Sequence, residues 1–104
     1  MSIKIYSCND SRGLRPMWTA EEMGVSYESE MMPFPPRFLH KEYMDVNILG
    51  TIPYLIDGDV EMTESVAMCQ YLVDLYGPTD LKVAIDEPDY HHYLNWLAHS
   101  DATL

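Results

Sequence analysis

Residues 51–77 read TIPYLIDGDVEMTESVAMCQYLVDLYG, and the pattern in this stretch decides the fold. A short apolar run, residues 51–56, is followed by Asp57-Gly58, a dipeptide typical of two-residue hairpin turns. A second short run, residues 60–63, comes after the turn. The stretch therefore predicts a β-hairpin made of a third and a fourth strand.

The hairpin leads into a helix with a regular apolar face. Apolar side chains recur at i, i+3, i+6, i+7 and i+10, which is a helical period. These positions are Val66, Cys69, Leu72, Val73 and Tyr76. Gly77 and Pro78 are expected to end the helix, because glycine is common just after a helix and proline cannot continue one.

The first part of the chain predicts a strand, a helix and a second strand. Residues 3–6 form a short apolar run, and residues 25–31 alternate between apolar and polar side chains as a half-buried strand does. Between them, the pattern turns helical from Leu14. Pro16 falls in the first turn, where proline is tolerated, and Gly24 is a natural left-handed stop.

A shorter helix is expected between the second strand and the hairpin. The sequence PFPP at residues 33–36 ends the second strand, and residues 37–46 then predict a short helix. We expect Phe38, Leu39 and Tyr43 to point inward from it.

The order of these elements predicts an α/β domain. Two strands joined through a helix lie parallel with a right-handed crossover, and the hairpin adds an antiparallel pair. We therefore expect a four-stranded mixed sheet with helices on both faces. Residues 1–78 form this domain, residues 79–87 a linker, and residues 88–104 a separate helix.

The last helix carries an apolar stripe that nothing obvious in the sequence covers. The stripe consists of Tyr90, Tyr93, Leu94 and Leu97. Large exposed apolar patches usually mark interfaces. We expect more chain, or another subunit, to cover this one.

Charge and composition exclude several classes of protein. The formal net charge is −11, with 17 acidic against 6 basic residues, so binding to nucleic acid or to anionic membranes is not expected. Of the bases, only Lys82 follows residue 42, so the first half of the chain is the better place for a small anionic ligand. The N-terminus lacks the pattern of a signal peptide, from which we expect a cytoplasmic protein with Cys8 and Cys69 as free thiols.

Ile52-Pro53 is the first candidate for function. Proline cannot donate to a sheet ladder, so Pro53 belongs at a strand start. A cis bond here would leave the main-chain N–H and C=O of Ile52 free to pair with an extended peptide. Most X-Pro bonds are trans, however, and the residues alone favour a purely structural proline.

Thr63-Glu64-Ser65, at the start of the third helix, is the second candidate. A helix N-terminus offers free N–H groups to a carboxylate, Ser65 adds a hydroxyl, and Glu64 can accept from an ammonium group. Together they suit an amino-acid head group. The alternative is that Thr63 caps the helix and Glu64 complements its dipole.

The first loop, YSCNDSRGLRP, is the third candidate. A thiolate near a helix N-terminus is stabilised, and Ser11 can donate a hydrogen bond to one. Cys8 and Ser11 also form a C-x-x-S arrangement, which suggests one-thiol redox chemistry. The alternative is that Asp10 or Ser11 caps the helix and Cys8 is a small buried filler. The histidines near the C-terminus lack the spacing of a metal site.

The order and spacing of these features resemble the N-terminal domain of cytosolic glutathione transferases. The stretches IYS…SRGLRPMWTAEEMGVSYE and IPYLIDGDVEMTESVAMCQYLVDLYG carry the resemblance, which covers residues 3–77. The family shows a cis-proline after an aliphatic or β-branched residue, a short hairpin, and Glu-Ser at the start of the third helix. The resemblance implies a thioredoxin-like βαβ-α-ββα fold followed by the first helix of an all-α domain. It also implies glutathione as co-substrate, an electrophilic small molecule as second substrate, no metal, and a homodimer.

The resemblance also implies roles for single residues. Ile52, before Pro53, would pair its main chain with the cysteine of glutathione, while Glu64 and Ser65 would hold the γ-glutamyl group. Ser11 would donate a hydrogen bond to the glutathione thiolate. Tyr6 is the alternative for that role, and Asp10 and Arg12 compete with Ser11 because the loop aligns only to within a residue or two.

The chain departs from the family pattern in two places. Many members carry a basic residue just before the aliphatic-proline pair, where this chain has Gly50-Thr51. We expect another basic residue to hold the glycyl carboxylate, and the candidates are Arg12, Arg37, His40 and Lys41. The second departure is the short helical part, from which we expect a fragment that binds glutathione without completing a transferase pocket.

Two rival functions remain open at this point. One is a glutathione-dependent thiol–disulfide oxidoreductase that uses Cys8. The other is a non-catalytic module that uses the thioredoxin-like fold for assembly.

Overall fold

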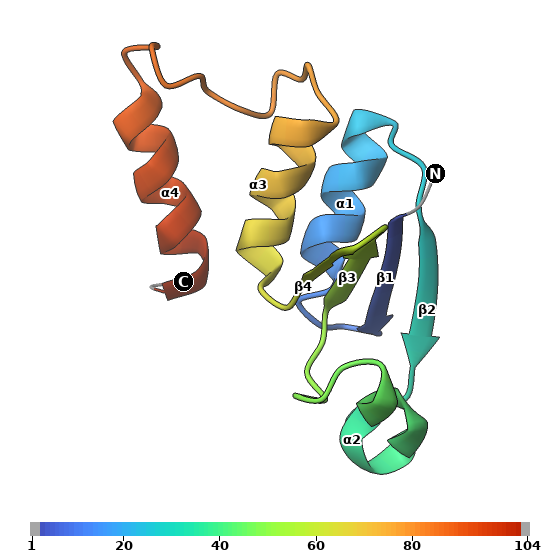
Figure 1. Ribbon diagram of the computed structural model, residues 1–104. Helices are drawn as coiled ribbons and strands as arrows, with labels where there is room; N and C mark the ends of the chain where they lie inside the picture. The colour runs from blue at the N-terminus through green and yellow to red at the C-terminus, as the bar shows by residue number, and fades with distance from the viewer. Residues whose placement is uncertain (1–2, 103–104) are drawn as a thin grey trace.

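The computed structural model describes residues 3–102 and confirms the predicted α/β architecture (Figure 1). The elements are β1 (Ile3–Cys8), α1 (Leu14–Met23), β2 (Glu28–Met32), α2 (Pro36–Leu39), a 3₁₀-helix η1 (Lys41–Asp45), β3 (Tyr54–Asp57), β4 (Val60–Met62), α3 (Ser65–Leu75) and α4 (Tyr90–Ala102). The order of elements matches the sequence prediction. Within residues 3–102, no helix has the length and apolar character needed to cross a membrane.

The sheet is mixed, as predicted, with the strand order β2-β1-β3-β4. β1 pairs with β2 in parallel, so that Ile5 lies opposite Ser29. β1 pairs with β3 in the antiparallel sense, and Ile5 lies opposite Leu55 there. The β3–β4 hairpin turns at Gly58, whose φ of +61° is a conformation that glycine adopts without steric penalty.

One face of the sheet forms the main core with α1 and α3, which lie side by side on it (Figure 1). Successive residues of a strand point to opposite faces, so alternate residues of β1 contribute to this core. The fully buried members are Ile3, Ile5, Ala20, Leu55, Met68 and Leu72. This core fixes where the first turns of α1 and α3 lie.

The other face of the sheet packs against the segment that contains α2 and η1. Its buried residues are Tyr6, Cys8, Met32, Tyr43 and Tyr54. The Tyr54 hydroxyl also donates to the Glu61 carboxylate across the hairpin. Helical segments therefore cover both faces, as the sequence predicts.

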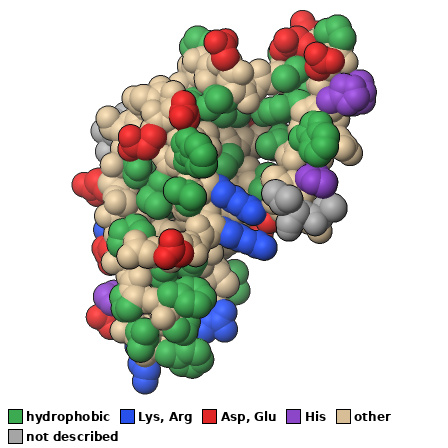
Figure 2. Space-filling view, turned by 180° about the vertical axis from the view of Figure 1, so that it is seen from behind, with side chains coloured by type: hydrophobic (Ala, Val, Ile, Leu, Met, Phe, Trp, Pro, Cys, Tyr) green, Lys and Arg blue, Asp and Glu red, His purple; other side chains and the backbone are tan. Residues whose placement is uncertain are grey.

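The region between β2 and β3 differs from its prediction. The expected helix over residues 37–46 is split into α2 and η1 at His40, which has non-helical backbone angles. Tyr43 points inward as expected, but Phe38 and Leu39 are 70% and 60% exposed, so their inward assignment was wrong. Because α2 has only four residues, it turns one side to the sheet and the rest to solvent. Figure 2 shows hydrophobic side chains gathered at this end of the molecule.

Several strand boundaries also differ. β2 begins at Glu28, three residues after the predicted start at residue 25. β1 continues to Cys8, two residues beyond the predicted end, and β3 begins at Tyr54 instead of residue 51. Pro53 cannot donate to the ladder, and the three residues before Tyr54 stay outside it. Those residues contain the first candidate site.

The last helix, α4, matches its predicted position, but none of its residues 90–102 is buried. Leu94 and Trp96 are 42% and 62% exposed. Of the predicted apolar stripe, Leu94 is exposed, whereas Tyr90, Tyr93 and Leu97 are half-buried.

Candidate functional site

The candidate site residues gather at one end of the molecule. The first loop, the stretch leading into β3, the start of α3 and the C-terminal end of α4 all lie at this end (Figure 1). The sheet and the α1–α3 pair determine this arrangement, because β1 ends where α1 and α3 begin.

The Ile52–Pro53 peptide bond is cis, as the resemblance implies and contrary to the general preference for trans. Pro53 is fully buried, and Ile52 is half-buried. Among residues 3–102, the main-chain N–H and C=O of Ile52 have no hydrogen-bond partner. These groups are available to an extended ligand.

Two buried side chains hold the residue before Ile52 in place. The Tyr43 hydroxyl donates to the Thr51 carbonyl oxygen over 2.6 Å, and the Asn47 side-chain amide donates to the same oxygen over 3.0 Å. Tyr43 is 1% and Asn47 4% exposed, and burial raises the pKa of the Tyr43 hydroxyl. Sequence reasoning placed Tyr43 inward without this role and missed Asn47.

The start of α3 combines an exposed carboxylate with helix-terminal donors. Glu64 is the N-cap residue and is exposed, and the Thr63 hydroxyl donates to its carboxylate over 3.0 Å. The alternative prediction that Thr63 caps the helix is therefore wrong. The first helical hydrogen bond runs from the Met68 N–H to the Glu64 carbonyl, so the N–H groups of the first turn have no intrahelical acceptor.

Ser65 is the first residue of α3 and is only 6% exposed. Its Oγ accepts a hydrogen bond from Arg15 Nη1 over 3.1 Å. Arg15 lies on α1, so this bond connects the first turns of two helices. Sequence reasoning selected Ser65 but did not assign a role to Arg15.

Ser11 is tied into the first loop. Its hydroxyl donates to the Cys8 carbonyl oxygen over 2.6 Å, and it accepts from the Gly13 N–H over 3.3 Å. A Cβ on residue 13 would lie 1.6 Å from Ser7 Oγ, so this position requires glycine. Gly13 is the N-cap of α1, which means that neither Asp10 nor Ser11 takes the N-cap position considered as the alternative.

Cys8 and Tyr6 lie on the face of the sheet that packs against α2 and η1. Cys8 is 2% exposed, and its thiol donates to the Pro33 carbonyl oxygen over 3.7 Å. Burial raises the pKa of this thiol, which is the opposite of what a thiolate at a helix N-terminus would show. Tyr6 packs between the rings of Tyr43 and Tyr54. Strand alternation thus directs both side chains away from the start of α1.

The four basic candidates for binding the glycyl carboxylate have different surroundings in the structure. Arg37 lies against Gly50, where a Cβ would be 2.7 Å from Arg37 Cγ, so Arg37 is next to the stretch that leads to Ile52. Arg12 pairs with Asp101 over 3.2 Å, and His40 lies 4.0 Å from Glu30 and 3.9 Å from Glu42. Lys41 is exposed. In residues 3–102, no group of three His, Cys, Asp or Glu side chains could hold a metal ion.

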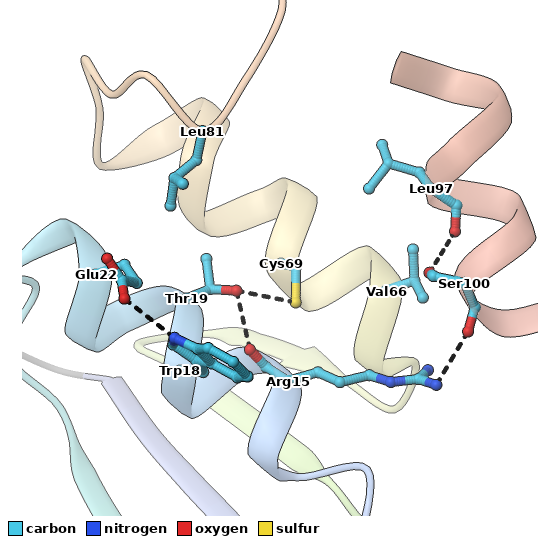
Figure 3. Close-up of a pocket in the computed structure, with 9 residues that line it drawn as sticks. All are labelled: Arg15, Trp18, Thr19, Glu22, Val66, Cys69, Leu81, Leu97 and Ser100. Atoms are coloured by element: carbon cyan, nitrogen blue, oxygen red, sulfur yellow. Dashed lines mark hydrogen bonds between the residues drawn. The ribbon is translucent and has the colours of Figure 1, made fainter. Parts of the chain in front are cut away.

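A pocket of about 480 Å³ lies between α1, α3 and α4 (Figure 3). Thr19, Cys69 and Leu97 come from the three helices that line it. The Thr19 hydroxyl donates to the Arg15 carbonyl oxygen over 2.9 Å and lies 3.3 Å from Cys69 Sγ. Burial raises the pKa of the Cys69 thiol, so this cysteine is not an activated nucleophile. Arg15 and Ser100 form the edge of the pocket nearest the start of α3.

The fold and the arrangement at this end define a thioredoxin-like domain with exposed main-chain groups before a cis-proline and an open helix start. A family model described as "Glutathione S-transferase, N-terminal domain" matches residues 1–74. The chain belongs to the glutathione S-transferase family.

Individual relatives agree with this assignment. Glutathione S-transferase 3 of Schizosaccharomyces pombe is 29% identical over 102 residues, which is 98% of this chain and 42% of that protein. A glutathione S-transferase structure from Actinobacillus pleuropneumoniae is similar with a TM-score of 0.80 at 30% identity, covering 94% of this chain and 47% of that chain. A glutathione transferase structure from Methylococcus capsulatus gives a TM-score of 0.84 at 25% identity, covering 96% and 51%. The chain thus spans about half the length of these relatives.

Proposed function

We propose that this chain is the glutathione-binding part of a glutathione transferase. The observation that carries the proposal is the unpaired main chain of Ile52, held beside buried Pro53 at the same end of the molecule as the start of α3. Family membership supports glutathione as the ligand. An extended tripeptide pairs with such main-chain groups as it would with a strand.

The two ends of glutathione suit the two sides of this site. The cysteinyl main chain pairs with Ile52, and the γ-glutamyl group lies at the start of α3. There its carboxylate accepts from Ser65 and first-turn N–H groups, and its ammonium group contacts Glu64. Of the four basic candidates, Arg37 is best placed for the glycyl carboxylate, because it lies beside Gly50.

The proposed chemistry is attack of the glutathione sulfur on an electrophilic small molecule. The thiol releases its proton to solvent, and the Ser11 hydroxyl changes its acceptor from the Cys8 carbonyl to the thiolate. The sulfur then forms a C–S bond, and the leaving group departs with its electron pair. Ser11 is favoured over Tyr6 and Cys8, because both of these lie buried under the opposite face of the sheet.

The two rival functions have less support. A thiol–disulfide exchanger using Cys8 needs an accessible thiolate, and Cys8 is 2% exposed with a raised pKa. For a non-catalytic assembly module, no contact in residues 3–102 gives specific support. The homodimer and the cytoplasmic location remain predictions.

Retention on immobilised glutathione tests the binding proposal. We expect the wild-type chain to be retained and Ser65→Ala to elute early, because that substitution removes a hydrogen bond to a charged group, worth roughly 1.5–3 kcal/mol. Ser29→Ala, on the exposed side of edge strand β2, is the control and should be retained like the wild type. A wild-type chain that is not retained would rule out the proposal and favour the assembly module.

Thiolate titration by ultraviolet absorbance tests Ser11 separately. We expect Ser11→Ala to raise the pKa of bound glutathione while binding persists, since the variant cannot donate to the thiolate. Ser26→Ala, an exposed serine after α1, is the control. An unchanged pKa in Ser11→Ala would exclude the hydroxyl as the thiolate donor.

A further inference from the structure

Arg15 connects the ends of three helices through its guanidinium group. Nη1 donates to Ser65 Oγ at 3.1 Å on α3 and to Asp101 Oδ1 at 2.9 Å on α4, while Nη2 donates to the Ser100 carbonyl oxygen at 3.1 Å. Figure 3 shows the side chain running along the edge of the pocket toward Ser100. No other side chain in residues 3–102 makes hydrogen bonds to both α3 and α4 in this way.

A second arginine strengthens the connection to α4. Arg12 Nη1 lies 3.2 Å from the same Asp101 oxygen that Arg15 contacts. Figure 2 shows two neighbouring basic side chains where the last helix approaches the α/β body. Two arginines share one carboxylate, so the group carries an excess of positive charge near the start of α3.

The hydrogen bond from Arg15 leaves the Ser65 hydroxyl able to act as a donor toward a further group. A hydroxyl has one proton and two lone pairs, whereas a guanidinium group has only donors. Arg15 therefore occupies a lone pair of Ser65 Oγ and leaves the proton for another acceptor. Ser65 is 6% exposed, so few acceptors other than a ligand at the helix start can reach it.

We propose that Arg15 is a positioning residue for the α-carboxylate of a γ-glutamyl ligand. Held by Asp101 and Ser100, it orients the Ser65 hydroxyl so that its proton points to the carboxylate. This inference rests on the proposed glutathione site. If Arg15 has this role, the C-terminal end of α4 contributes to ligand affinity through Asp101 and Ser100, although none of the residues of α4 is buried.

Calorimetric titration with two peptides tests the proposal. One is glutathione, and the other is γ-aminobutyryl-cysteinyl-glycine, which lacks the α-carboxylate but keeps the ammonium group. We expect Arg15→Gln to weaken glutathione binding about tenfold and to change binding of the analogue by less than about twofold, because the lost hydrogen bond serves a charged group. Lys82→Gln, which removes a charge paired with Asp74 away from the site, should change neither affinity.

Two further variants separate positioning from a structural role. Asp101→Asn leaves α1 and α3 unchanged but weakens the hold on Arg15, and it should reduce glutathione affinity about threefold. Combining Arg15→Gln with Ser65→Ala should weaken binding no more than the stronger single variant does, because both act on one hydroxyl. Arg15→Lys should restore part of the affinity.

The outcomes distinguish this inference from the function on which it rests. Suppose that the wild type binds glutathione but Arg15→Gln weakens binding of both peptides equally; the positioning role is then overturned, while the proposed glutathione site stands. The same holds if the losses of binding free energy in Arg15→Gln and Ser65→Ala add in the double variant. If wild type does not bind glutathione, the proposed function and this inference both fail. If Arg15→Gln does not fold, Asp101→Asn provides the same comparison of the two peptides.

Discussion

Helices α3 and α4 carry similar apolar stripes in the sequence but have different surroundings in the structure. α3 buries Met68 and Leu72 in the core that it forms with the sheet and α1. α4 buries none of its residues 90–102, and its Leu94 and Trp96 are largely exposed. The comparison teaches that a helical period predicts a helix but does not tell which surface packs against it.

The largest loss of stability is expected from a substitution in the core-facing side of α3. Leu72→Ala should reduce the free energy of unfolding by about 2–5 kcal/mol, because Leu72 is completely buried and its truncation leaves a cavity. Urea denaturation followed by circular dichroism measures the change. Leu75→Ala, in the same helix but 60% exposed, is the matched control and should change stability by less than about 0.5 kcal/mol. Equal losses in both variants would contradict the assigned packing of α3.

An intermediate loss of stability is expected from a substitution where the end of α3 meets the hairpin. Tyr76 donates to Asp57 Oδ2 over 2.5 Å, and Tyr71 donates to the same oxygen over 2.8 Å. Tyr76→Phe should reduce the free energy of unfolding by about 1 kcal/mol at neutral pH, the typical net value of one hydrogen bond. Tyr71→Phe is the matched variant, and the same urea titration measures both.

The same bond gives the stability a pH dependence. The hydrogen bond to Asp57 raises the pKa of Tyr76 from 10.0 to about 12. Because the folded-state pKa is the higher one, this stabilisation is fully present below pH 10 and is lost as the pH rises through about 12. Tyr76→Phe should therefore show a smaller loss of stability over this range than wild type. A variant with an unchanged alkaline profile would show that Tyr76 is not the titrating group.

The smallest effect is expected in α4. Leu94→Ala should change the free energy of unfolding by less than about 0.5 kcal/mol, because Leu94 is 42% exposed and loses few contacts. The measurement is the same urea titration, run beside Leu72→Ala. A loss of 2 kcal/mol or more, as expected for a buried leucine, would show that the α4 stripe is covered in solution.

Local signals in the sequence predicted most of the fold. Gly24 and Gly58 both have positive φ, as their positions after a helix and in a hairpin indicate. The inward assignment of two hydrophobic residues was wrong because the helix that carries them is shorter than predicted. Phe38 and Leu39 were assigned inward by hydrophobicity, but four residues of helix cannot turn all their side chains to the sheet.

The candidate site was predicted only in part, because the sequence shows local signals but not which distant residues meet in space. Ile52 and Ser65 were selected because a proline and a helix start are visible in the sequence. The residues that support them were missed, because Arg15 is 50 positions from Ser65 and 86 from Asp101. Cys8 was considered as a thiolate because it lies near a helix start in sequence. β1 instead continues two residues further than predicted, through Cys8, and strand alternation directs its side chain to the opposite face.

The close approach of Gly13 to Ser7 has a consequence for engineering the first loop. Any side chain at position 13 would place its Cβ 1.6 Å from Ser7 Oγ, so the two residues must be treated as a unit. A combinatorial library that randomises Asn9, which is at the surface, while preserving this unit should therefore yield many well-folded members. Asp10 has a φ of +57°, so position 10 is best restricted to glycine, asparagine and aspartate. Libraries that extend through Gly13 should yield mostly misfolded ones unless Ser7 is replaced by glycine at the same time, because a Cβ at position 13 would also lie 2.5 Å from Ser7 Cβ.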